Sequence, residues 1–478
     1  MKFEKTIIEQ FLKISNLYSK KNALVINKER YTFENLLNKS KLIAERIIYY
    51  SKKDKIIAIC TDRSAEQIFS IIACLLANKS YIILDEKVPL AKKRIILSKL
   101  KIKTIIIEDK KKLVFKNVKK LELKKIQKKK NDFVYKNENL NDIIYYIFTS
   151  GSTGEPKGIQ INNSNLLWFV KNCIQTFNFS KNERFILLPY LSFDLSVFPL
   201  WISLCTGSTL YYTTGSDIIY PINYIKKNKI TVYCSVPSQI NLITNVLIKN
   251  KTTLNSVKKS FFCGEPLKNS QVRLWKNFFQ KSKIFNTYGP SETTCFNTYY
   301  EIKKIKKSEV NDIASIGKPL PNNKIILKKG EIYIEGPQVS QGYIDKNHNN
   351  SFEKKDSGNF IYKTGDFAKK IGNNYHFLGR KDQQIKISGY RLELGEIEKI
   401  ILKILKKNIG VVAIFFNKKI IIAIEGKLVI SKTQKERINE KLPNYAIPSK
   451  YIHFTKFPLN KNFKIDIKKI KEKIQNEY

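Results

Sequence analysis

Short apolar runs alternate with amphipathic, lysine-flanked stretches from the start of the chain to about residue 380. Each run has the length of a buried strand, and each longer stretch has apolar residues at helical spacing. Three such pairs are "KIIAIC" (55–60) with "SAEQIFSIIACLLANK" (64–79), "SYIILD" (80–85) with "LAKKRIILSKLK" (90–101), and "ITVYCSV" (230–236) with "PSQINLITNVLIKN" (237–250). This alternation predicts α/β layers with mainly parallel sheets, whose ligands lie beyond the carboxyl ends of the strands.

The pattern changes twice toward the end of the chain. "GEIYIEG" (330–336) and "IYKTGDFAKKIGNNYHFLGR" (361–380) predict shorter β elements. Beyond residue 382 we expect a compact α+β unit, with a helix at "ELGEIEKIILKILKK" (393–407), a strand pair at "GVVAIFF" (410–416) and "KKIIIAIEG" (418–426), and a further helix. The sequence therefore predicts a large N-terminal region, residues 1–381, and a small C-terminal domain, residues 382–478.

Composition narrows the class of protein. A chain of 478 residues with 42% hydrophobic residues is long enough for more than one globular core. Its longest apolar stretches, such as "IFSIIACLLA" (68–77), fall well short of the roughly 20 residues of a membrane helix. The start of the chain mixes acids and bases, unlike a signal peptide, and the seven cysteines form no C-x-x-C pair. These features favour a cytoplasmic protein without an integral membrane segment, a disulfide framework or a zinc site.

The formal charge of +46 raises the question of nucleic-acid binding. Only nine of the 87 basic residues are arginine, however, and nucleic-acid readers depend on the bidentate arginine fork. The lysine-dense segment 101–130 is interpreted as a solvated face. We therefore expect no nucleic-acid partner, but a charge of this size should attract acidic macromolecules in a salt-dependent manner.

One loop has the composition of an anion-binding site. "FTSGSTGEPKG" (148–158) follows the apolar run "DIIYY" (142–146) and combines glycines, hydroxyls and Lys157. Backbone N–H groups and hydroxyls of such a loop can surround a phosphate, although neither the P-loop spacing nor G-x-G-x-x-G is present. A flexible surface turn is the alternative, against which Pro156 predicts a stiff exit from the loop. The candidate phosphate-binding residues are Thr149, Ser150, Gly151, Ser152, Thr153 and Gly154.

Four later stretches suit the other parts of a nucleotide. "NTYGPSETT" (286–294) contains Glu292, a carboxylate suited to Mg²⁺ bound to ATP. "YKTGD" places Asp366 after an expected tight turn, where it could accept hydrogen bonds from a ribose diol. "GRKDQQIKISGYRLELGEIE" (379–398) adds Arg380 and Asp382, and "PLNKNFKID" (458–466) contains Lys464. Singly, each is more often a solvated charge.

In this order and spacing, the motifs resemble those of the adenylate-forming ligases, in particular the amino-acid-activating branch of D-alanine–carrier-protein ligases and nonribosomal peptide synthetase adenylation domains. The resemblance extends from "RYTFENL" (30–36) to "NKNFKID" (460–466). It implies layered α/β subdomains, a small β-barrel-like subdomain and a mobile α+β C-terminal domain hinged at Asp382.

The resemblance also implies a two-step reaction that uses ATP and Mg²⁺. A substrate carboxylate attacks the α-phosphorus of ATP, and a phosphopantetheine thiol then displaces AMP. Lys464 and Arg380 would be catalytic, Glu292 would hold the metal ion, and Lys386 and Gly389 would face the thiol after the C-terminal domain rotates. The implied ATP-binding set comprises residues 149–154 together with Asn286, Thr287, Tyr288, Gly289, Pro290, Ser291, Asp366, Arg380 and Lys464.

The aspartate of "FDLS" (193–196) points to the substrate, because amino-acid activators pair that carboxylate with the α-ammonium group. The alternative is that Asp194 only caps the helix that follows. By resemblance, Asp194, Cys263 and Cys295 would contact the substrate, with Cys263 narrowing the site as in D-alanine ligases. Alignment by motif gives the lining as Asp194, Leu195, Phe198, Phe261, Cys263, Thr287 and Cys295, which favours alanine or another small amino acid.

Three positions depart from the family pattern: Ser291 replaces a threonine, Phe463 stands where glycine is usual, and Pro199 falls inside a helix-like stretch. No stretch resembles a carrier domain, so we expect a separate, acidic, phosphopantetheinylated carrier protein as partner. Activation of another amino acid in nonribosomal peptide synthesis, an acyl-CoA synthetase and a basic nucleic-acid-binding protein remain as alternatives. Cys263 as a catalytic nucleophile has no histidine with a motif-level reason to activate it.

Overall fold

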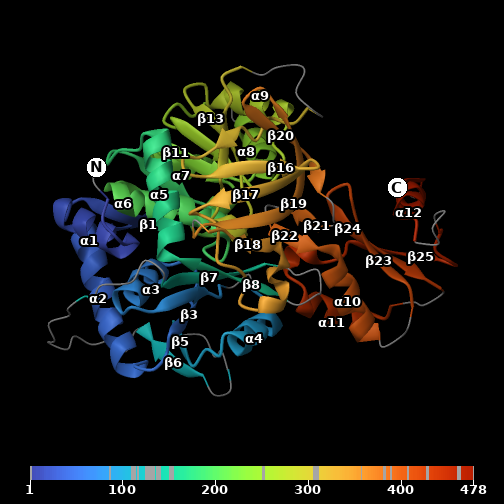
Figure 1. Cartoon of the computed structure of the whole chain (residues 1–478), viewed down its shortest axis with the longest axis horizontal. Coiled ribbons are helices and arrows are strands. Elements are labelled where there is room, and N and C mark those ends of the chain that lie inside the picture. Colours follow the sequence, from blue (N-terminus) through green and yellow to red (C-terminus); the bar gives the residue numbers. More distant parts are fainter. Residues whose placement is uncertain are drawn as a thin grey trace. The chain divides into compact units, whose positions relative to one another are not determined.

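The protein was analysed as a computed structural model (Figure 1). The structure describes residues 3–85, 88–108, 115, 118–123, 135, 142–149, 156–249, 253–304, 312–356, 358–380, 384–387, 390–405, 409–426, 430–459 and 465–476. Contacts divide the chain into two compact units. The first comprises residues 1–86, 97–147 and 158–381, and the second comprises 87–96, 148–157 and 382–478. The single boundary at residue 382 that the sequence suggests stays a prediction.

A six-stranded sheet of order β6-β5-β3-β4-β7-β8 uses the first strand–helix pairs of the sequence. Its strands are β3 (Ile56–Cys60), β4 (Ser80–Ile83), β5 (Thr104–Ile107), β6 (Lys119–Glu122), β7 (Ile143–Thr149) and β8 (Lys157–Asn162). The nearby helices are α1 (Ile7–Leu17), α2 (Phe33–Tyr50), α3 (Ala65–Leu76) and α4 (Leu90–Lys99). Strands β3 to β7 pair in parallel, as strand–helix alternation predicts.

A nine-stranded sheet of order β15-β14-β13-β12-β11-β9-β10-β1-β2 forms the centre of the first unit. Its strands are β1 (Asn22–Ile26), β2 (Glu29–Thr32), β9 (Arg184–Leu187), β10 (Thr209–Tyr212), β11 (Val232–Ser235), β12 (Lys259–Phe262), β13 (Lys283–Tyr288), β14 (Thr298–Glu301) and β15 (Lys318–Pro319). Its helices are α5 (Asn163–Phe177), α6 (Val197–Thr206), α7 (Ile222–Asn228), α8 (Ser238–Lys249) and α9 (Asn269–Phe278). Strands β1 and β9 to β13 pair in parallel, so their carboxyl ends share one edge.

Both faces of the central strands β10 and β11 are buried, which explains why these strands carry few polar residues. In β10, Leu210 and Tyr212 enter one core while Tyr211 enters the other. The first core continues to the six-stranded sheet through β3, and the second contains Trp275 of α9.

A five-stranded antiparallel sheet completes the first unit (Figure 1). Its strands are β16 (Lys324–Lys328), β17 (Glu331–Gly336), β18 (Phe352–Lys354), β19 (Phe360–Ile371) and β20 (Asn374–Arg380). The expected β elements are therefore confirmed, but β19 is not short: it has 12 residues and runs as one strand through the tight turn that we predicted before Asp366. Gly365 adopts a positive φ of 73° where the register of β19 against its neighbours shifts. The chain bends there but does not reverse its direction, so β19 continues as one strand.

The C-terminal part of the second unit has the predicted α+β texture. A hairpin of β21 (Gln384–Ile387) and β22 (Tyr390–Glu393) precedes a three-stranded sheet of β23 (Val411–Phe416), β24 (Lys419–Glu425) and β25 (Lys450–Phe454). The helices are α10 (Leu394–Leu405), α11 (Lys432–Lys441) and α12 (Ile467–Asn476). Separate apolar clusters cover the two faces of the sheet, with Ile422 in one and Ile421 in the other. Strand β25, which joins in parallel, was not expected.

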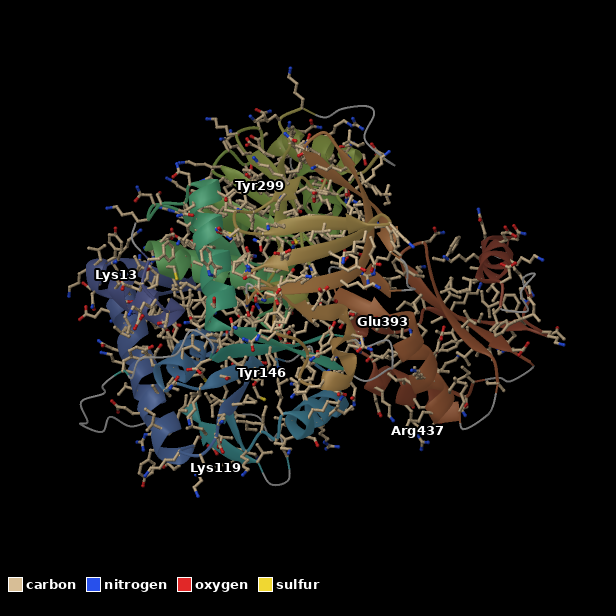
Figure 2. All side chains as sticks on the ribbon, in the orientation of Figure 1. Lys13, Lys119, Tyr146, Tyr299, Glu393 and Arg437 are labelled. Atoms are coloured by element: carbon tan, nitrogen blue, oxygen red, sulfur yellow. The ribbon has the colours of Figure 1, made fainter. Side chains whose placement is uncertain are left out.

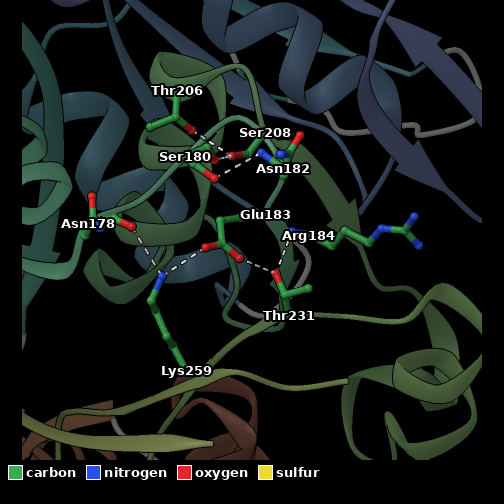
Figure 3. Close-up of polar contacts among 9 residues, drawn as sticks. All are labelled: Asn178, Ser180, Asn182, Glu183, Arg184, Thr206, Ser208, Thr231 and Lys259. Carbon is green, nitrogen blue, oxygen red and sulfur yellow. Dashed lines mark hydrogen bonds and ion pairs between the residues drawn. The ribbon is translucent and has the colours of Figure 1, made fainter. Parts of the chain in front are cut away.

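A buried polar network lies at the amino ends of β9, β11 and β12 (Figure 3). Lys259 Nζ lies 2.9 Å from Glu183 Oε1, and the Thr231 hydroxyl donates to Glu183 Oε2 at 2.6 Å. The two charged side chains are only 16% and 10% exposed. The network ties three strands together at the edge opposite their carboxyl ends.

Lysines also project from the surface, as Lys13 and Lys119 do in Figure 2. All seven cysteines are buried thiols. None of the helices in the described part of the chain has the length and apolar character needed to cross a membrane.

Candidate active site

Several candidate residues of the first unit lie at or beyond the carboxyl ends of the parallel strands in the nine-stranded sheet. Asp194 follows β9, Cys263 follows β12, and Tyr288 ends β13. The Cys263 N–H donates to the Ser235 carbonyl at 3.2 Å, and the Thr287 hydroxyl donates to the Phe262 carbonyl at 3.1 Å. These bonds fix the ends of β11, β12 and β13 against one another at the edge where open α/β sheets bind ligands.

Asp194 contacts a motif that lies 97 residues further along the chain. Its Oδ2 accepts a hydrogen bond from the hydroxyl of Ser291, next to Glu292. The Asp194 side chain does not cap a helix: it begins a 3-10 turn, Asp194–Ser196, whose cap is Phe193, and Ser196 caps α6, with no side-chain cap bond at either position. These contacts give no support to the helix-cap alternative, and contact of Asp194 with the substrate stays a prediction. The 3-10 turn also places Pro199 in the first turn of α6, where its missing N–H is tolerated.

Several buried thiols lie close enough to Asp194 to interact with its charge or with one another. Burial, followed by the charge of Asp194 and by the nearby thiols of Cys263, Cys234 and Cys173, raises the pKa of Cys295 well above its usual value. The Cys295 thiol is therefore protonated at neutral pH and contributes bulk, not charge. Asp194 and Cys263 thus both lie near Cys295, and contact of the three residues with the substrate stays a prediction.

Aromatic side chains belong to the same apolar core as Cys263 and Cys295. Phe198 and Phe261 are fully buried, with ring centres 4.8 Å apart. Phe261 also stacks on Phe285 at 4.8 Å, and Phe198 packs on Phe296 at 5.4 Å. Because each ring packs against others, these side chains are held firmly in place.

Asp366 is held from two sides in the first unit. Arg380 Nη1 lies 2.6 Å from its Oδ1, and the Tyr288 hydroxyl donates to its Oδ2 at 2.6 Å. The Asp366 side chain is only 5% exposed. Burial, together with the Asp366 charge, raises the pKa of Tyr288 well above its usual value, so its hydroxyl remains a donor across the physiological range. β19 and β20 place Asp366 opposite Arg380 by register.

Glu292 lies in the short 3-10 turn Ser291–Thr293 and is fully buried. The Tyr343 hydroxyl donates to its Oε1 at 2.6 Å, and the Ser340 N–H donates to its carbonyl at 2.9 Å. Gly289 allows the loop to close, because a Cβ there would lie 2.4 Å from the backbone of Phe296. Pro290 precedes the turn as its cap.

Asn286 makes structural hydrogen bonds within the first unit. Its side-chain amide donates to the carbonyls of Ala314 and Ser315 at 3.1 and 2.9 Å. This amide therefore fixes β13 to the chain ahead of β15, and a contact of Asn286 with ATP stays a prediction.

The remaining predicted residues are placed only in part. Thr149 is the buried last residue of β7. Outside the described residues lie Ser150, Gly151, Ser152, Thr153, Gly154, Asp382, Gly389, Phe463 and Lys464, and for Lys386 only the backbone in β21 is described. Sequence reasoning missed Tyr343, whose hydroxyl donates to Glu292, although Tyr343 ends the stretch "GPQVSQGY" (336–343).

Among the described residues, no group of three or more His, Cys, Asp or Glu side chains forms a metal centre. Glu292 supplies a single carboxylate, which accepts a hydrogen bond from the Tyr343 hydroxyl. One such carboxylate suits Mg²⁺, which takes most of its ligands from phosphates and water.

Comparison with known proteins identifies the family. A family model described as "AMP-binding enzyme" matches residues 13–344. The chain is 30% identical over 463 residues to a D-alanine--D-alanyl carrier protein ligase of Staphylococcus epidermidis, covering 93% of this chain and 94% of the relative. It is 33% identical over 359 residues to the protein of the same name in Bacillus licheniformis, covering 70% and 71%.

Solved structures share the fold. An adenylation domain, AlmE of Vibrio cholerae, in complex with glycyl-adenosine-5'-phosphate, matches with a TM-score of 0.86 at 21% identity, covering 100% of this chain and 99% of that chain. Holo-PA1221, a nonribosomal peptide synthetase protein containing adenylation and PCP domains, matches with a TM-score of 0.84 at 20% identity, covering 98% of this chain and 84% of that chain. The expected mixed α/β adenylate-forming fold is confirmed, and the chain belongs to the AMP-binding enzyme family.

Proposed function

We propose that this protein is an ATP-dependent, AMP-forming ligase that activates D-alanine as an aminoacyl-adenylate and transfers it to the phosphopantetheine thiol of a separate carrier protein. The observation that carries this proposal is the buried Asp194 carboxylate bonded to Ser291, the residue before Glu292. Curated relatives that match 93% of the chain are named for the same activity.

Asp194 is the partner for the α-ammonium group. A buried carboxylate gains most from a cation, and a substrate without one would leave the Asp194 charge uncompensated in a desolvated site. The contact with Ser291 places this recognition group beside the loop that carries Glu292. The substrate ammonium and the reacting phosphate would therefore be positioned by the same short segment.

The firmly packed aromatic rings of the core favour a substrate with a small side chain. Phe198 and Phe261 are fully buried and packed against further rings, so they cannot swing aside for a bulky substrate without disturbing the core. The buried thiols of Cys263 and Cys295 add volume next to Asp194. A methyl side chain fits this description better than a branched or aromatic one.

The ATP side uses Asp366 and Glu292. Each oxygen of Asp366 accepts one bond, from Arg380 or Tyr288, and a carboxylate oxygen has a second lone pair that can accept a ribose hydroxyl. Glu292 would hold Mg²⁺, which neutralises phosphate charge as the two anionic reactants meet. Arg380 would contribute further positive charge.

Residues 382–478 would act as the mobile domain. We infer that Lys464 bridges the attacking carboxylate and the α-phosphate in the first step, and that rotation at Asp382 brings Lys386 and Gly389 to the thiol in the second. A net charge of +46 suits an acidic carrier protein met by diffusion in the cytoplasm.

The test is an ATP–pyrophosphate exchange panel with the purified protein and D-alanine, L-alanine, glycine and propionate. We expect exchange with D-alanine to exceed the others and propionate, which lacks only the amino group, to give the least. Transfer is then followed with a holo carrier protein and with free CoA. Preferential exchange with propionate and efficient transfer to CoA would assign the protein to the acyl-CoA synthetases instead.

A further inference from the structure

Arg63 reaches from the first strand–helix pair to the end of β9. It lies three residues beyond the end of β3, and its Nη2 donates to the Leu187 carbonyl at 2.8 Å. Its Nη1 donates to the carbonyls of Leu188 and Pro189 at 3.2 and 3.1 Å. Three consecutive carbonyls at the carboxyl end of β9 are thus held by one guanidinium.

The same guanidinium is anchored on the neighbouring strand. Its Nε donates to the Thr213 carbonyl at 2.9 Å, and its Nη2 donates to the Thr213 hydroxyl at 3.2 Å. Its central carbon lies 4.5 Å from the ring centre of Tyr212 and 4.9 Å from that of Tyr190. The Tyr212 hydroxyl in turn donates to Gln67 of α3, so Arg63 is fixed by β3, α3 and β10 before it contacts the segment after β9.

That segment leads directly to Asp194. Tyr190, whose ring lies against Arg63, accepts a hydrogen bond through its carbonyl from the Phe193 N–H at 2.9 Å. Phe193 is the cap of the 3-10 turn that Asp194 begins. One backbone turn therefore separates Tyr190, which contacts Arg63, from Asp194, whose carboxylate is bonded to Ser291.

We propose that Arg63 is a positioning residue for amino-acid recognition: by fixing residues 187–190 it sets the place of the Asp194 carboxylate. This inference rests on the proposed function, because it assigns the consequence of a displaced Asp194 to the amino-acid substrate. Arginine suits the role since its planar fork can bond several carbonyls in fixed directions and stack on rings at once. Lysine keeps the charge but presents a single ammonium group.

The test compares Arg63→Lys with Arg184→Lys. Arg184 begins the same strand at its other end, is also half-buried, and donates through Nη1 to the Asn228 carbonyl at 2.9 Å. In ATP–pyrophosphate exchange we expect R63K to raise the KM for D-alanine about tenfold or more while the KM for ATP changes less than about threefold, because a small misplacement of a binding group is costly. R184K should leave both within about twofold.

Hydrogen exchange provides a readout that does not depend on activity. In R63K, backbone amides of residues 188–194 should exchange faster than in the unsubstituted protein, with little change in β11 to β13, and R184K should leave residues 188–194 unchanged. Tyr190→Leu, which removes one ring but no arginine bond, should shift the same amides and the D-alanine KM in the same direction. It serves as a second variant if R63K is poorly folded.

The two proposals fail in different ways. If the unsubstituted protein gives no ATP–pyrophosphate exchange with D-alanine, the proposed function is wrong. Faster hydrogen exchange in R63K that is confined to residues 188–194 would still support the positioning by Arg63. Equal rises in the KM for ATP and for D-alanine, or faster hydrogen exchange throughout the nine-stranded sheet, would reduce Arg63 to a general structural role.

Discussion

Asp194→Asn is the sharpest test of the substrate assignment, because it removes the charge and keeps the shape of the side chain. Asparagine still offers Oδ1 to the Ser291 hydroxyl, so the contact between the two motifs can persist. Two unit charges about 4 Å apart interact by about 4 kcal/mol at an effective dielectric constant of about 20. A neutral amide oxygen retains a part of this attraction.

We therefore expect D194N to lose about 3 kcal/mol of transition-state stabilisation with D-alanine, or a fall in kcat/KM of roughly 100- to 200-fold. Propionate has no ammonium group, so its kcat/KM should stay the same or rise. The measurement is ATP–pyrophosphate exchange with both acids over a range of concentrations. The ratio of the two specificity constants removes differences in the amount of folded enzyme.

Asp217→Asn is the matched control. Asp217 is another aspartate of the first unit, half-buried where Asp194 is buried, and burial raises its pKa. It lies in the 3-10 turn Gly215–Ile218, outside the site. D217N should leave the D-alanine to propionate ratio unchanged. An equal loss with both acids in D194N would mean that Asp194 supports the loop and does not recognise the ammonium group.

Four further outcomes are expected. Tyr288→Phe removes a buried donor to Asp366, so the KM for ATP should rise about tenfold with little change for D-alanine, and equal changes in both would contradict a ribose role. Lys464→Ala should slow adenylate formation about a hundredfold while transfer from supplied aminoacyl-adenylate persists, and near-normal exchange would remove Lys464 from the first step. Lys259→Met leaves Glu183 buried without its ion pair, so urea denaturation should show a free energy of unfolding lower by about 2–3 kcal/mol, while the KM values for ATP and D-alanine stay unchanged. A stability equal to that of the unsubstituted protein would show that the ion pair is dispensable. Loading of an acidic carrier should slow as salt rises from 0.1 to 1 M, where the Debye length falls from about 10 to about 3 Å, while pyrophosphate exchange should change little; salt-independent loading would exclude electrostatic docking.

Strand and helix positions were largely predictable from the sequence. The apolar runs at 55–60, 80–85 and 230–236 became β3, β4 and β11, because runs buried on both faces have no polar alternation to obscure them. The error at Asp366 has a local cause. The glycine of "YKTGD" is a turn signal in sequence, but here its positive φ produces an irregularity inside β19, which only the pairing with β17 and β20 could reveal.

The sequence motifs mark the candidate site residues, but they do not reveal which residues hold these side chains in place. Motif order marked Asp194, Glu292 and Asp366, but each is placed by a residue from elsewhere in the chain. Ser291 contacts Asp194 across 97 positions, and Tyr343 contacts Glu292 across 51. Contacts between residues so far apart leave no periodic pattern in the sequence, because they depend on which strand ends lie next to one another in the sheet.

Arg63 shows the same limit most clearly. It reaches across 124 to 150 positions to the carbonyls at the ends of β9 and β10, groups that every residue carries and that no sequence pattern distinguishes. A residue that acts on backbone carbonyls can therefore be recognised only once the fold is known. If residues 187–190 do set the position of Asp194, then the amino acid that this enzyme prefers is decided in part by a side chain of the first strand–helix pair that touches neither substrate. Substitutions that alter the preference for one amino acid over another should accordingly be sought around Arg63, Tyr190 and Tyr212 as well as among the residues that line the site.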